Sequence, residues 1–370
     1  MSQKKKICLI GNSSWSLLNF RSDLIKSFLN KYEVFIVAPD REFSKEIENM
    51  ECKFIFYELN RKSINPFKEL TAIWKLSRIF KSYNFDYVLS FNIKPNLYSC
   101  IAGCFIRTRV MPNVSGLGST FLLKGLLPYI IKYLYKLSFK FADHIFFQNK
   151  ADLEIFIQSK IIFAQSYSVL PGSGINLLNY PKNNQHLLTR KDQYNFTYLG
   201  RMIKDKGVQE LLQAAKYFDK NSNISFNLYG DFDDNNPSAL SLNEIKPYLS
   251  PNIRYHGRTD SVLEVLGKTT CVILPSYREG MSRTLLEAAG CGIPLIASDV
   301  PGCKEIVIDG YNGFIVAPRD VNSLKIAIQN FIKLKNEKVY QLGSNSRKLV
   351  ERDFSVEKII SEYNKILMKD

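Results

Sequence analysis

Short β-rich runs alternate with longer helical stretches along most of the chain, and this order limits the possible folds more than any other feature. The first series of apolar, strand-length runs lies at residues 7–10, 34–38, 54–57, 87–91, 110–113 and 144–148. Segments with helical spacing of apolar residues, such as residues 22–30 and 67–82, separate these runs. A β-α-β-α order predicts a parallel, doubly wound sheet with helices on its faces.

A second series of the same kind follows a break in the pattern. Residues 172–192 are rich in Gly, Asn, Pro and polar side chains, which is typical of a linker. Strand-length runs then recur at residues 196–199, 225–229, 253–256, 271–274, 295–298 and 314–316. We therefore predict an α/β fold with two Rossmann-like domains, residues 1–175 and 185–352, facing a central cleft. The amphipathic segment 353–370 is expected to pack back on the first domain.

Composition excludes several classes of protein. The first apolar run, residues 7–10, is too short for a signal peptide, and no run has the length of a membrane-spanning helix. The chain is therefore expected to be cytoplasmic, either soluble or peripheral on a membrane. Its seven cysteines are scattered and it has only three histidines, so no metal site is expected. We interpret the acidic residues at 231–234 as solvated side chains in a turn.

The formal net charge of +15 is concentrated in the first half of the chain. Residues 1–180 contain 24 Lys or Arg and 13 Asp or Glu, whereas residues 181–370 contain 26 and 22. Such an excess suits nucleic acid, anionic lipid or polyphosphate ligands. No nucleic-acid-binding motif accompanies it, so nucleic acid is not an expected partner.

The most specific motif begins after the run at 271–274 and reads PSYREGMSRTLLEAAGCGIP at residues 275–294. We place Glu279 on a loop and Glu287 inside the helix that follows, with both side chains directed to the cleft. Carboxylates suit the hydroxyl groups of a sugar or ribose, because they accept hydrogen bonds without donating any. Free backbone N–H groups at the helix start suit a diphosphate, and we expect them at Gly280, Met281 and Ser282. The alternative is two solvated glutamates beside a core helix.

A second motif reads YLGRMIKDKGV at residues 198–208. A strand ends in a turn at Gly200, Arg201 follows it directly, and Lys206 precedes the next helix. Two cations at the carboxyl edge of a sheet can neutralise a diphosphate without a metal ion. Taken alone, the motif is equally compatible with an exposed basic turn.

Together these motifs resemble the retaining glycosyltransferases of the GT-B fold, family 4. The resemblance implies that Glu279 contacts the donor sugar and Glu287 the ribose of the nucleotide. It also implies that Arg201 and Lys206 bind the donor diphosphate and stabilise the departing nucleotide, with no metal ion or other cofactor. Glu305 matches a position that lies near the donor in this family.

In the first domain, Gly11 and Asn12 form a glycine turn after the first strand that does not match the dinucleotide-binding GxGxxG pattern. A plain tight turn is the alternative to a ligand contact. In the family, the matching loop closes over the donor phosphates and leads to acceptor contacts, which places Arg21 near the acceptor. Many relatives carry a histidine near the position of Ser115 and Gly116, two residues that we expect to contact the acceptor.

The segment around Gly116 and the segment 92–96 resemble a bacterial subgroup that builds polyprenyl-diphosphate-linked glycans, of the N-acetylgalactosaminyltransferase type. Lys94 would then suit an acceptor phosphate, although an ordinary surface lysine is the alternative. The resemblance implies retaining transfer of a hexose or N-acetylhexosamine, with N-acetylgalactosamine as first choice. The donor would be a UDP-sugar and the acceptor a polyprenyl-diphosphate-linked saccharide in the assembly of a bacterial surface polysaccharide or glycan.

Residues 121–141 alternate lysines with aromatic and aliphatic side chains. A helix here would be either a membrane-surface helix or a core helix whose lysines extend along its exposed edge. Membrane contact would place the protein on the cytoplasmic face of the inner membrane. The alternative functions are a nucleotide-sugar epimerase of similar fold, a non-catalytic membrane scaffold and, on the basic charge alone, a nucleic-acid-binding protein.

Overall fold

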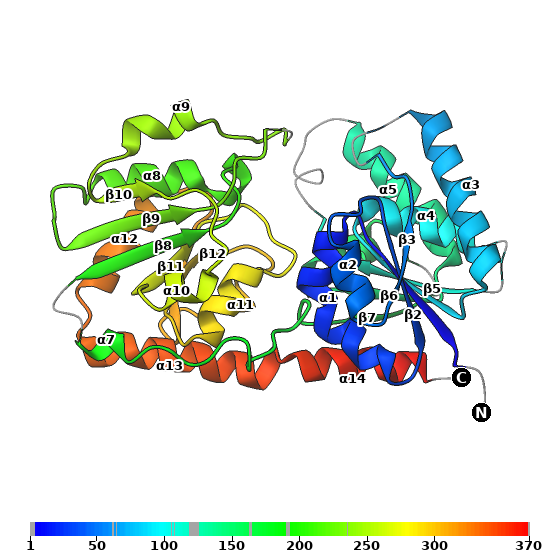
Figure 1. The fold of residues 1–370 in the computed structure, drawn as a ribbon. Coiled ribbons are helices and arrows are strands. Elements are labelled where there is room, and N and C mark those ends of the chain that lie inside the picture. The colour runs from blue at the N-terminus through cyan, green and yellow to red at the C-terminus, as the bar shows by residue number, and fades with distance from the viewer. Residues whose placement is uncertain are drawn as a thin grey trace. The chain divides into compact units, whose positions relative to one another are not determined.

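The computed structural model describes residues 4–60, 63, 65–104, 106, 108–117, 126–162, 165–189, 193–234 and 236–368. The chain divides into two compact units, each with a parallel sheet of its own (Figure 1). The first unit comprises Met1–Gly174 together with Val356–Asp370, and the second comprises Ile175–Ser355. The predicted α/β class with two Rossmann-like units is confirmed.

The sheet of the first unit has seven strands in the order β3-β2-β1-β4-β5-β6-β7, all parallel. These strands are β1 (Lys6–Ile10), β2 (Glu33–Ala38), β3 (Lys53–Phe56), β4 (Tyr87–Phe91), β5 (Arg109–Val114), β6 (His144–Phe147) and β7 (Ser166–Val169). The central strands β1 and β4 are buried along almost their whole length, which explains their continuous apolar runs. The edge strand β7 is half exposed, and its sequence SYSV lacks such a run, so the sequence did not predict it.

Helices cover both faces of this sheet. They are α1 (Ser14–Leu29), α2 (Ser44–Asn49), α3 (Pro66–Tyr83), α4 (Ile93–Gly103), α5 (Leu127–Ser138), the 3-10 helix η2 (Phe139–Phe141), α6 (Lys150–Gln158) and α14 (Val356–Leu367). One core cluster joins Leu76 of α3 and Phe139 of η2 to one face of the sheet. The other cluster joins Phe28 of α1 and Tyr363 of α14 to the opposite face.

The sheet of the second unit has six parallel strands in the order β10-β9-β8-β11-β12-β13. They are β8 (Tyr194–Leu199), β9 (Ile224–Tyr229), β10 (Ile253–Tyr255), β11 (Cys271–Leu274), β12 (Leu295–Ser298) and β13 (Gly313–Val316). The helical segments are α7 (His186–Thr189), η3 (Lys204–Lys206), α8 (Val208–Lys216), α9 (Leu242–Ile245), η4 (Lys246–Tyr248), α10 (Val262–Leu266), α11 (Arg283–Gly290), α12 (Val321–Ile332) and α13 (Asn336–Asp353).

Part of the segment expected to be a linker is structured within the second unit. Ile175 and Leu187 are fully buried in its core, and the N–H of Ile175 donates to the carbonyl oxygen of Phe354 at 2.9 Å. The chain returns to the first unit only at Val356, where α14 buries Ile359 and Tyr363. Because most residues at 172–192 are polar, the sequence did not indicate that Ile175 and Leu187 would be buried.

None of the described helices is long and apolar enough to span a membrane.

Candidate functional site

The sheet of the second unit reverses its strand order between β8 and β11, which are neighbours in space but not in the chain. In open parallel sheets, ligands bind beyond the carboxyl ends of the strands at such a reversal. Arg201 lies two residues after β8, and Glu279 lies on the loop after β11. Both motifs therefore open onto the same edge of the sheet.

A close backbone contact brings Lys206 to this edge. Gly207, which follows Lys206, has a φ of +70°, and a Cβ atom there would lie 2.0 Å from the carbonyl oxygen of Pro275. Only glycine fits this approach without moving the loop. The N–H of Tyr277 donates to the carbonyl oxygen of Asp205 at 2.8 Å. The turn that carries Lys206 is thus tied to the loop after β11.

Lys206 and Glu279 form an ion pair, with 2.5 Å between Nζ and Oε1. The hydroxyl of Ser276 donates to the same carboxylate oxygen at 2.7 Å. These side chains of Lys206 and Glu279 are 21% and 11% exposed, so the pair is largely buried but reachable. The N–H of Glu279 donates to the carbonyl oxygen of Pro301 at 3.1 Å, and Gly302 packs against Glu279. A ligand diphosphate that binds Lys206 competes with Glu279 for the ammonium group.

Arg201 lies in a more open position, with 56% of its side chain exposed. Its Nη1 atom is 2.7 Å from Oδ2 of Asp233, so one acid of the 231–234 turn is a partner of Arg201. Among the residues that the structure describes, no group of three or more His, Cys, Asp or Glu is arranged to hold a metal ion. The chemistry offered here is cationic, because Arg201 and Lys206 can both donate to phosphate oxygens.

Glu287 lies on α11, where two donors meet one of its oxygens. Oε1 accepts from the hydroxyl of Tyr180 and from Nε of Arg283, each at 2.8 Å. Burial lowers the pKa of Arg283, but Glu287 and Tyr180 together outweigh burial and leave that pKa raised. Burial, followed by the charge of Glu287, raises the pKa of Tyr180 to about 12, so its phenol stays protonated as a donor. The carboxylate is therefore held in one orientation.

Neither Tyr180 nor Arg283 was predicted as a site residue. Arg283 stands four residues before Glu287 on one helix, a spacing that places the two side chains on the same face. That spacing was the signal in the sequence. Tyr180 gave no signal, because it lies in the segment interpreted as a linker.

The start of α11 differs in one respect from the prediction. Ser282 caps the helix, and its hydroxyl accepts from the N–H of Leu285 at 3.3 Å. However, the N–H of Ser282 donates to the carbonyl oxygen of Gly302 at 2.9 Å. The prediction of a free N–H at Ser282 is therefore wrong, because the loop after β12 takes it. Donor binding by Gly280 and Met281 stays a prediction.

Glu305 forms a hydrogen bond within the loop after β12. Its Oε2 atom accepts from the N–H of Gly302 at 2.7 Å. Because Gly302 packs against Glu279, Glu305 lies one contact away from the ion pair. A role in shaping the loop follows from this arrangement.

The sheet of the first unit has a similar reversal between β1 and β4. Gly11 and Asn12 follow β1, and their N–H groups donate to the carbonyl oxygen of Val37 at 3.2 Å and to Oδ1 of Asn92 at 3.3 Å. Ser115 and Gly116 follow β5 at the same carboxyl edge, where Gly116 has a φ of +117°. Gly118, in the segment around Gly116, lies outside the described residues.

Arg21 and Lys94 occupy structured positions in the first unit. Arg21 is 6% exposed and its guanidinium lies 4.4 Å over the ring of Phe91. The ammonium of Lys94 donates to both carboxylate oxygens of Glu69 at 3.0 Å and to the carbonyl oxygens of Asn60 and Ser63. A phosphate would have to compete with Glu69 for Lys94. Acceptor binding by Arg21, Lys94, Ser115 and Gly116 stays a prediction.

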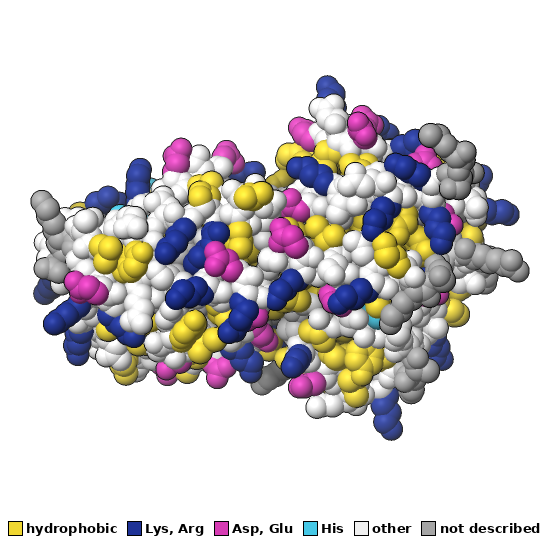
Figure 2. Space-filling model, turned by 90° about the horizontal axis from the view of Figure 1, so that it is seen from below, with side chains coloured by type: hydrophobic (Ala, Val, Ile, Leu, Met, Phe, Trp, Pro, Cys, Tyr) yellow, Lys and Arg dark blue, Asp and Glu magenta, His cyan; other side chains and the backbone are white. Residues whose placement is uncertain are grey.

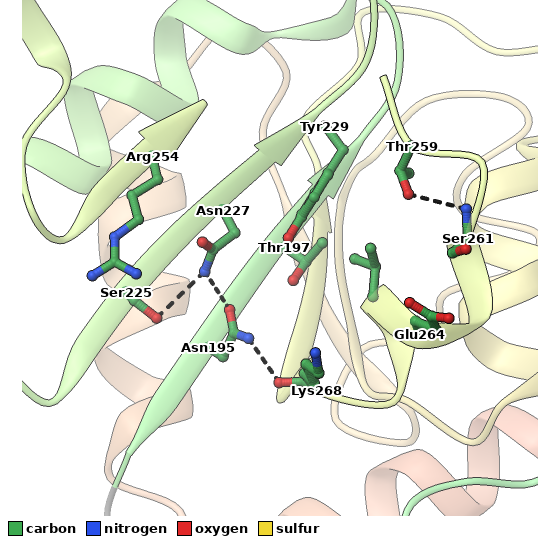
Figure 3. Close-up of a pocket in the computed structure, with 11 residues that line it drawn as sticks. Asn195, Thr197, Ser225, Asn227, Tyr229, Arg254, Thr259, Ser261, Glu264 and Lys268 are labelled. Atoms are coloured by element: carbon green, nitrogen blue, oxygen red, sulfur yellow. Dashed lines mark hydrogen bonds between the residues drawn. The ribbon is translucent and has the colours of Figure 1, made fainter. Parts of the chain in front are cut away.

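A cavity of about 390 Å³ lies on the polar face of β8 and β9, against α10. Figure 3 shows Asn227 bonded to Asn195 and Ser225, and Asn195 bonded to the backbone of Lys268. His256 adds a contact of 2.7 Å from Nε2 to Oδ1 of Asn227. The cavity contains none of the predicted site residues. Its polar side chains alternate with apolar ones along β8 and β9, as in strands that have one polar face.

Comparison with known proteins agrees with this geometry. Residues 179–349 match the family described as Glycosyl transferases group 1, and residues 6–149 match Glycosyl transferase 4-like. The chain is 30% identical over 349 residues to the Campylobacter jejuni N,N'-diacetylbacillosaminyl-diphospho-undecaprenol alpha-1,3-N-acetylgalactosaminyltransferase, with 90% of each chain covered. It is 23% identical to the Escherichia coli UDP-Gal:alpha-D-GlcNAc-diphosphoundecaprenol alpha-1,3-galactosyltransferase, covering 81% of this chain and 80% of that protein.

The fold is shared with Anabaena Alr3699/HepE, solved in complex with UDP. The TM-score is 0.79 at 18% identity, with 98% of this chain and 99% of the other covered. Two Rossmann-like units, each with a parallel sheet, define the GT-B class of enzymes. The chain belongs to the GT-B glycosyltransferases of family 4.

Proposed function

We propose that this glycosyltransferase moves an N-acetylhexosamine or hexose, first choice N-acetylgalactosamine, from a UDP-sugar to a polyprenyl-diphosphate-linked saccharide with retention of configuration. The observation that carries the proposal is the cluster of Arg201, Lys206 and Glu279 where β8 and β11 end. It places two cations and a carboxylate at the sheet edge where a nucleotide diphosphate would bind. The product belongs to the assembly of a bacterial surface polysaccharide or glycan.

In the proposed donor complex, the diphosphate replaces Glu279 as the partner of Lys206 and also bonds Arg201. Glu279, released from Lys206, accepts hydrogen bonds from the donor sugar, and Glu287 accepts them from the ribose. An acceptor hydroxyl oxygen bonds to the anomeric carbon while the bond from that carbon to the UDP oxygen breaks. The hydroxyl proton passes to the departing phosphate. Stabilisation of the developing phosphate charge by the two cations is the main catalytic contribution.

The proposed acceptor rests on the names of two relatives, both of which act on undecaprenyl-diphosphate-linked sugars. Such an acceptor stays in a bilayer, so the enzyme would work as a peripheral protein on the cytoplasmic face of the inner membrane. The carboxyl edge of the first sheet, with Ser115 and Gly116, is the proposed acceptor side. Gly11 and Asn12 would border the donor phosphates.

A UDP-release assay tests the proposal, with a panel of UDP-sugars and a synthetic polyprenyl-diphosphate-linked saccharide. We expect release that requires both one particular donor and the acceptor, and an α-linked product from an α-linked donor by NMR. Inversion at the anomeric carbon would contradict retention. Conversion of a UDP-sugar to its epimer without an acceptor would replace the proposal with an epimerase, and a strict need for a different nucleotide would correct the donor.

A further inference from the structure

The helix α3 exposes an apolar stripe on the side opposite to its core face. Phe67, Leu70 and Trp74 are 81%, 64% and 56% exposed, and their spacing of three and four residues places them on one side of the helix. Leu76 and Phe80 of the same helix are fully buried. A second, contiguous apolar face exposed to solvent is typical of an interaction site.

The helix α5 repeats this arrangement. Tyr129 and Tyr133 are 71% and 60% exposed, and Ile130 is exposed beside them, whereas Tyr135 is buried. Both α3 and α5 pack against α4, on the same face of the sheet of the first unit (Figure 1). We call Phe67, Leu70, Trp74, Tyr129, Ile130 and Tyr133 the aromatic surface. Residues 121–125 of the segment that suggested membrane contact lie outside the described residues.

Basic side chains accompany the aromatic surface, with little acid to balance them. The helix α3 carries four Lys or Arg and one Glu, and that Glu69 is already paired with Lys94. The helix α5 contains two lysines and η2 contains one, and neither has an acidic residue. Arg78 lies 5.0 Å from the ring of Trp74, so a cation lies at one end of the apolar stripe.

The helices α13 and α14 carry a different mixture of charges. The helix α13 has four basic and three acidic residues, and α14 has two of each. Figure 2 likewise shows Lys and Arg interspersed with Asp and Glu. The uncompensated positive charge of α3 and α5 is therefore a local property.

We propose that the aromatic surface docks on an anionic lipid bilayer, with Trp74 inserted at the level of the headgroups. Trp and Tyr favour this level because their rings are apolar and carry one polar atom. Lysines around such a surface are attracted to anionic lipids. A symmetric dimer through the same surface would place like charges opposite each other, which disfavours a second copy as the occupant.

This inference rests on the proposed lipid-linked acceptor, and it adds the helix α3 to the segment that the sequence suggested. Both helices belong to the first unit, which is the unit proposed to bind the acceptor. Docking through these helices would restrict the diffusion of the enzyme to the bilayer surface, where the lipid-linked acceptor lies.

Tryptophan fluorescence tests the docking directly, because the chain has two tryptophans, Trp15 and Trp74. In a Trp15→Phe background, Trp74 is the single reporter. With vesicles of phosphatidylethanolamine and phosphatidylglycerol we expect a blue shift of its emission and quenching by brominated lipid. Phosphatidylcholine vesicles or high salt should suppress both. An unshifted emission on the anionic vesicles at low salt would overturn the proposal.

Vesicle sedimentation of the Phe67→Ser/Leu70→Ser variant extends the test. Loss of these two anchors should weaken partitioning at least about tenfold. Ile326→Ser is the matched control, since Ile326 is an exposed isoleucine on α12 of the second unit, and it should bind like the parent. Equal binding of the two variants, or a dimer that the Phe67→Ser/Leu70→Ser variant dissociates, would contradict bilayer docking.

Transfer to a short-chain, water-dispersed acceptor separates this inference from the proposed function. We expect both variants to retain the parent rate, because Phe67 and Leu70 are not part of the site. If the parent enzyme binds vesicles but transfers no sugar, the proposed function fails and the docking stands. If it transfers sugar but ignores anionic vesicles, the docking fails alone.

Discussion

At the scale of single residues, the ion pair between Lys206 and Glu279 links donor binding to catalysis. Their charged atoms lie 2.5 Å apart, so a diphosphate that binds Lys206 and a sugar that binds Glu279 both compete with this contact. Ser276 keeps Glu279 in place through a bond that does not involve Lys206. The carboxylate can therefore release the lysine without losing its own orientation.

Replacing Glu279 by Gln should reduce kcat by roughly 10² to 10³, the usual cost of removing one preorganised polar contact from a transition state. The amide keeps the size of the side chain but loses its charge. Glu264→Gln, in the cavity of Figure 3, is the matched control in the same unit and should retain full activity. Steady-state UDP release measures both. Equal activity of the two variants would remove Glu279 from the site.

Chelation should leave the rate unchanged, because Arg201 and Lys206 supply the positive charge that a metal ion provides in other enzymes. The measurement is UDP release after dialysis against EDTA, compared with the same sample after addition of Mg²⁺ or Mn²⁺. A rate that falls with EDTA and returns with one of these ions would contradict a purely cationic donor site.

Tyr180→Phe should act on donor affinity rather than on chemistry. It removes one of the two donors to Oε1 of Glu287, a loss of about 1 kcal/mol, and so raises KM for the UDP-sugar about fivefold. The value of kcat should change little, because the ribose is remote from the reacting bond. Tyr217→Phe, an exposed tyrosine at the end of α8, is the control. A fall in kcat at constant KM would refute this role.

The sequence predicted Lys206 and Glu279 because each belongs to a motif of local residues. It did not predict that Asp233 would pair with Arg201, or that Tyr180 would bind Glu287. Both partners are remote in the chain, and their types are common in turns and linkers. Local patterns identify the groups that do chemistry, whereas the partners that orient them depend on tertiary packing.

At the scale of elements, many predicted strands match those of the structure because the most buried parallel strands carry near-continuous apolar runs. Strand β11, with all four residues buried, shows this clearly. The edge strand β7 has a polar, half-exposed sequence, and the segment near Ile175 has the composition of a linker although Ile175 is buried. Their places are set by neighbouring elements, which a local pattern does not report.

The turn between η3 and α8 gives a prediction at this scale. Gly207→Ala combines a left-handed backbone with a Cβ atom 2.0 Å from the carbonyl oxygen of Pro275, so the loop after β11 has to move. Gly310→Ala is the matched control, since Gly310 also has a φ of +70° but nothing within 4 Å of the added atom. Both substitutions carry about 1 kcal/mol of backbone strain.

The steric conflict at Gly207 should add roughly 2 kcal/mol or more to its destabilisation, together with weaker binding of UDP. Urea unfolding followed by circular dichroism, and titration calorimetry with UDP, measure the two effects. Equal stability and equal UDP affinity in Gly207→Ala and Gly310→Ala would show that this approach does not position Lys206.

At the scale of the whole molecule, the last helix of the chain completes the first unit. Tyr363 of α14 is fully buried, and its hydroxyl accepts from Nδ2 of Asn113 at 2.5 Å. Its ring lies 4.5 Å from that of Phe146 and 6.5 Å from that of Phe28. The core of the first unit therefore closes only when the C-terminal segment has been made, so this unit has the higher contact order.

Tyr363→Ala should lower the free energy of unfolding of the first unit by about 3–5 kcal/mol, since it removes a large buried ring and leaves the amide of Asn113 without its partner. Fluorescence isolates this unit, because both tryptophans of the chain, Trp15 and Trp74, lie in α1 and α3. The tryptophan transition in urea should shift to lower concentration, while the later part of the circular dichroism transition, from the second unit, stays in place. Lys365→Ala, on the exposed side of α14, should move neither. A tryptophan transition that does not shift in Tyr363→Ala, or a common shift of both signals, would show that α14 does not stabilise the first unit separately.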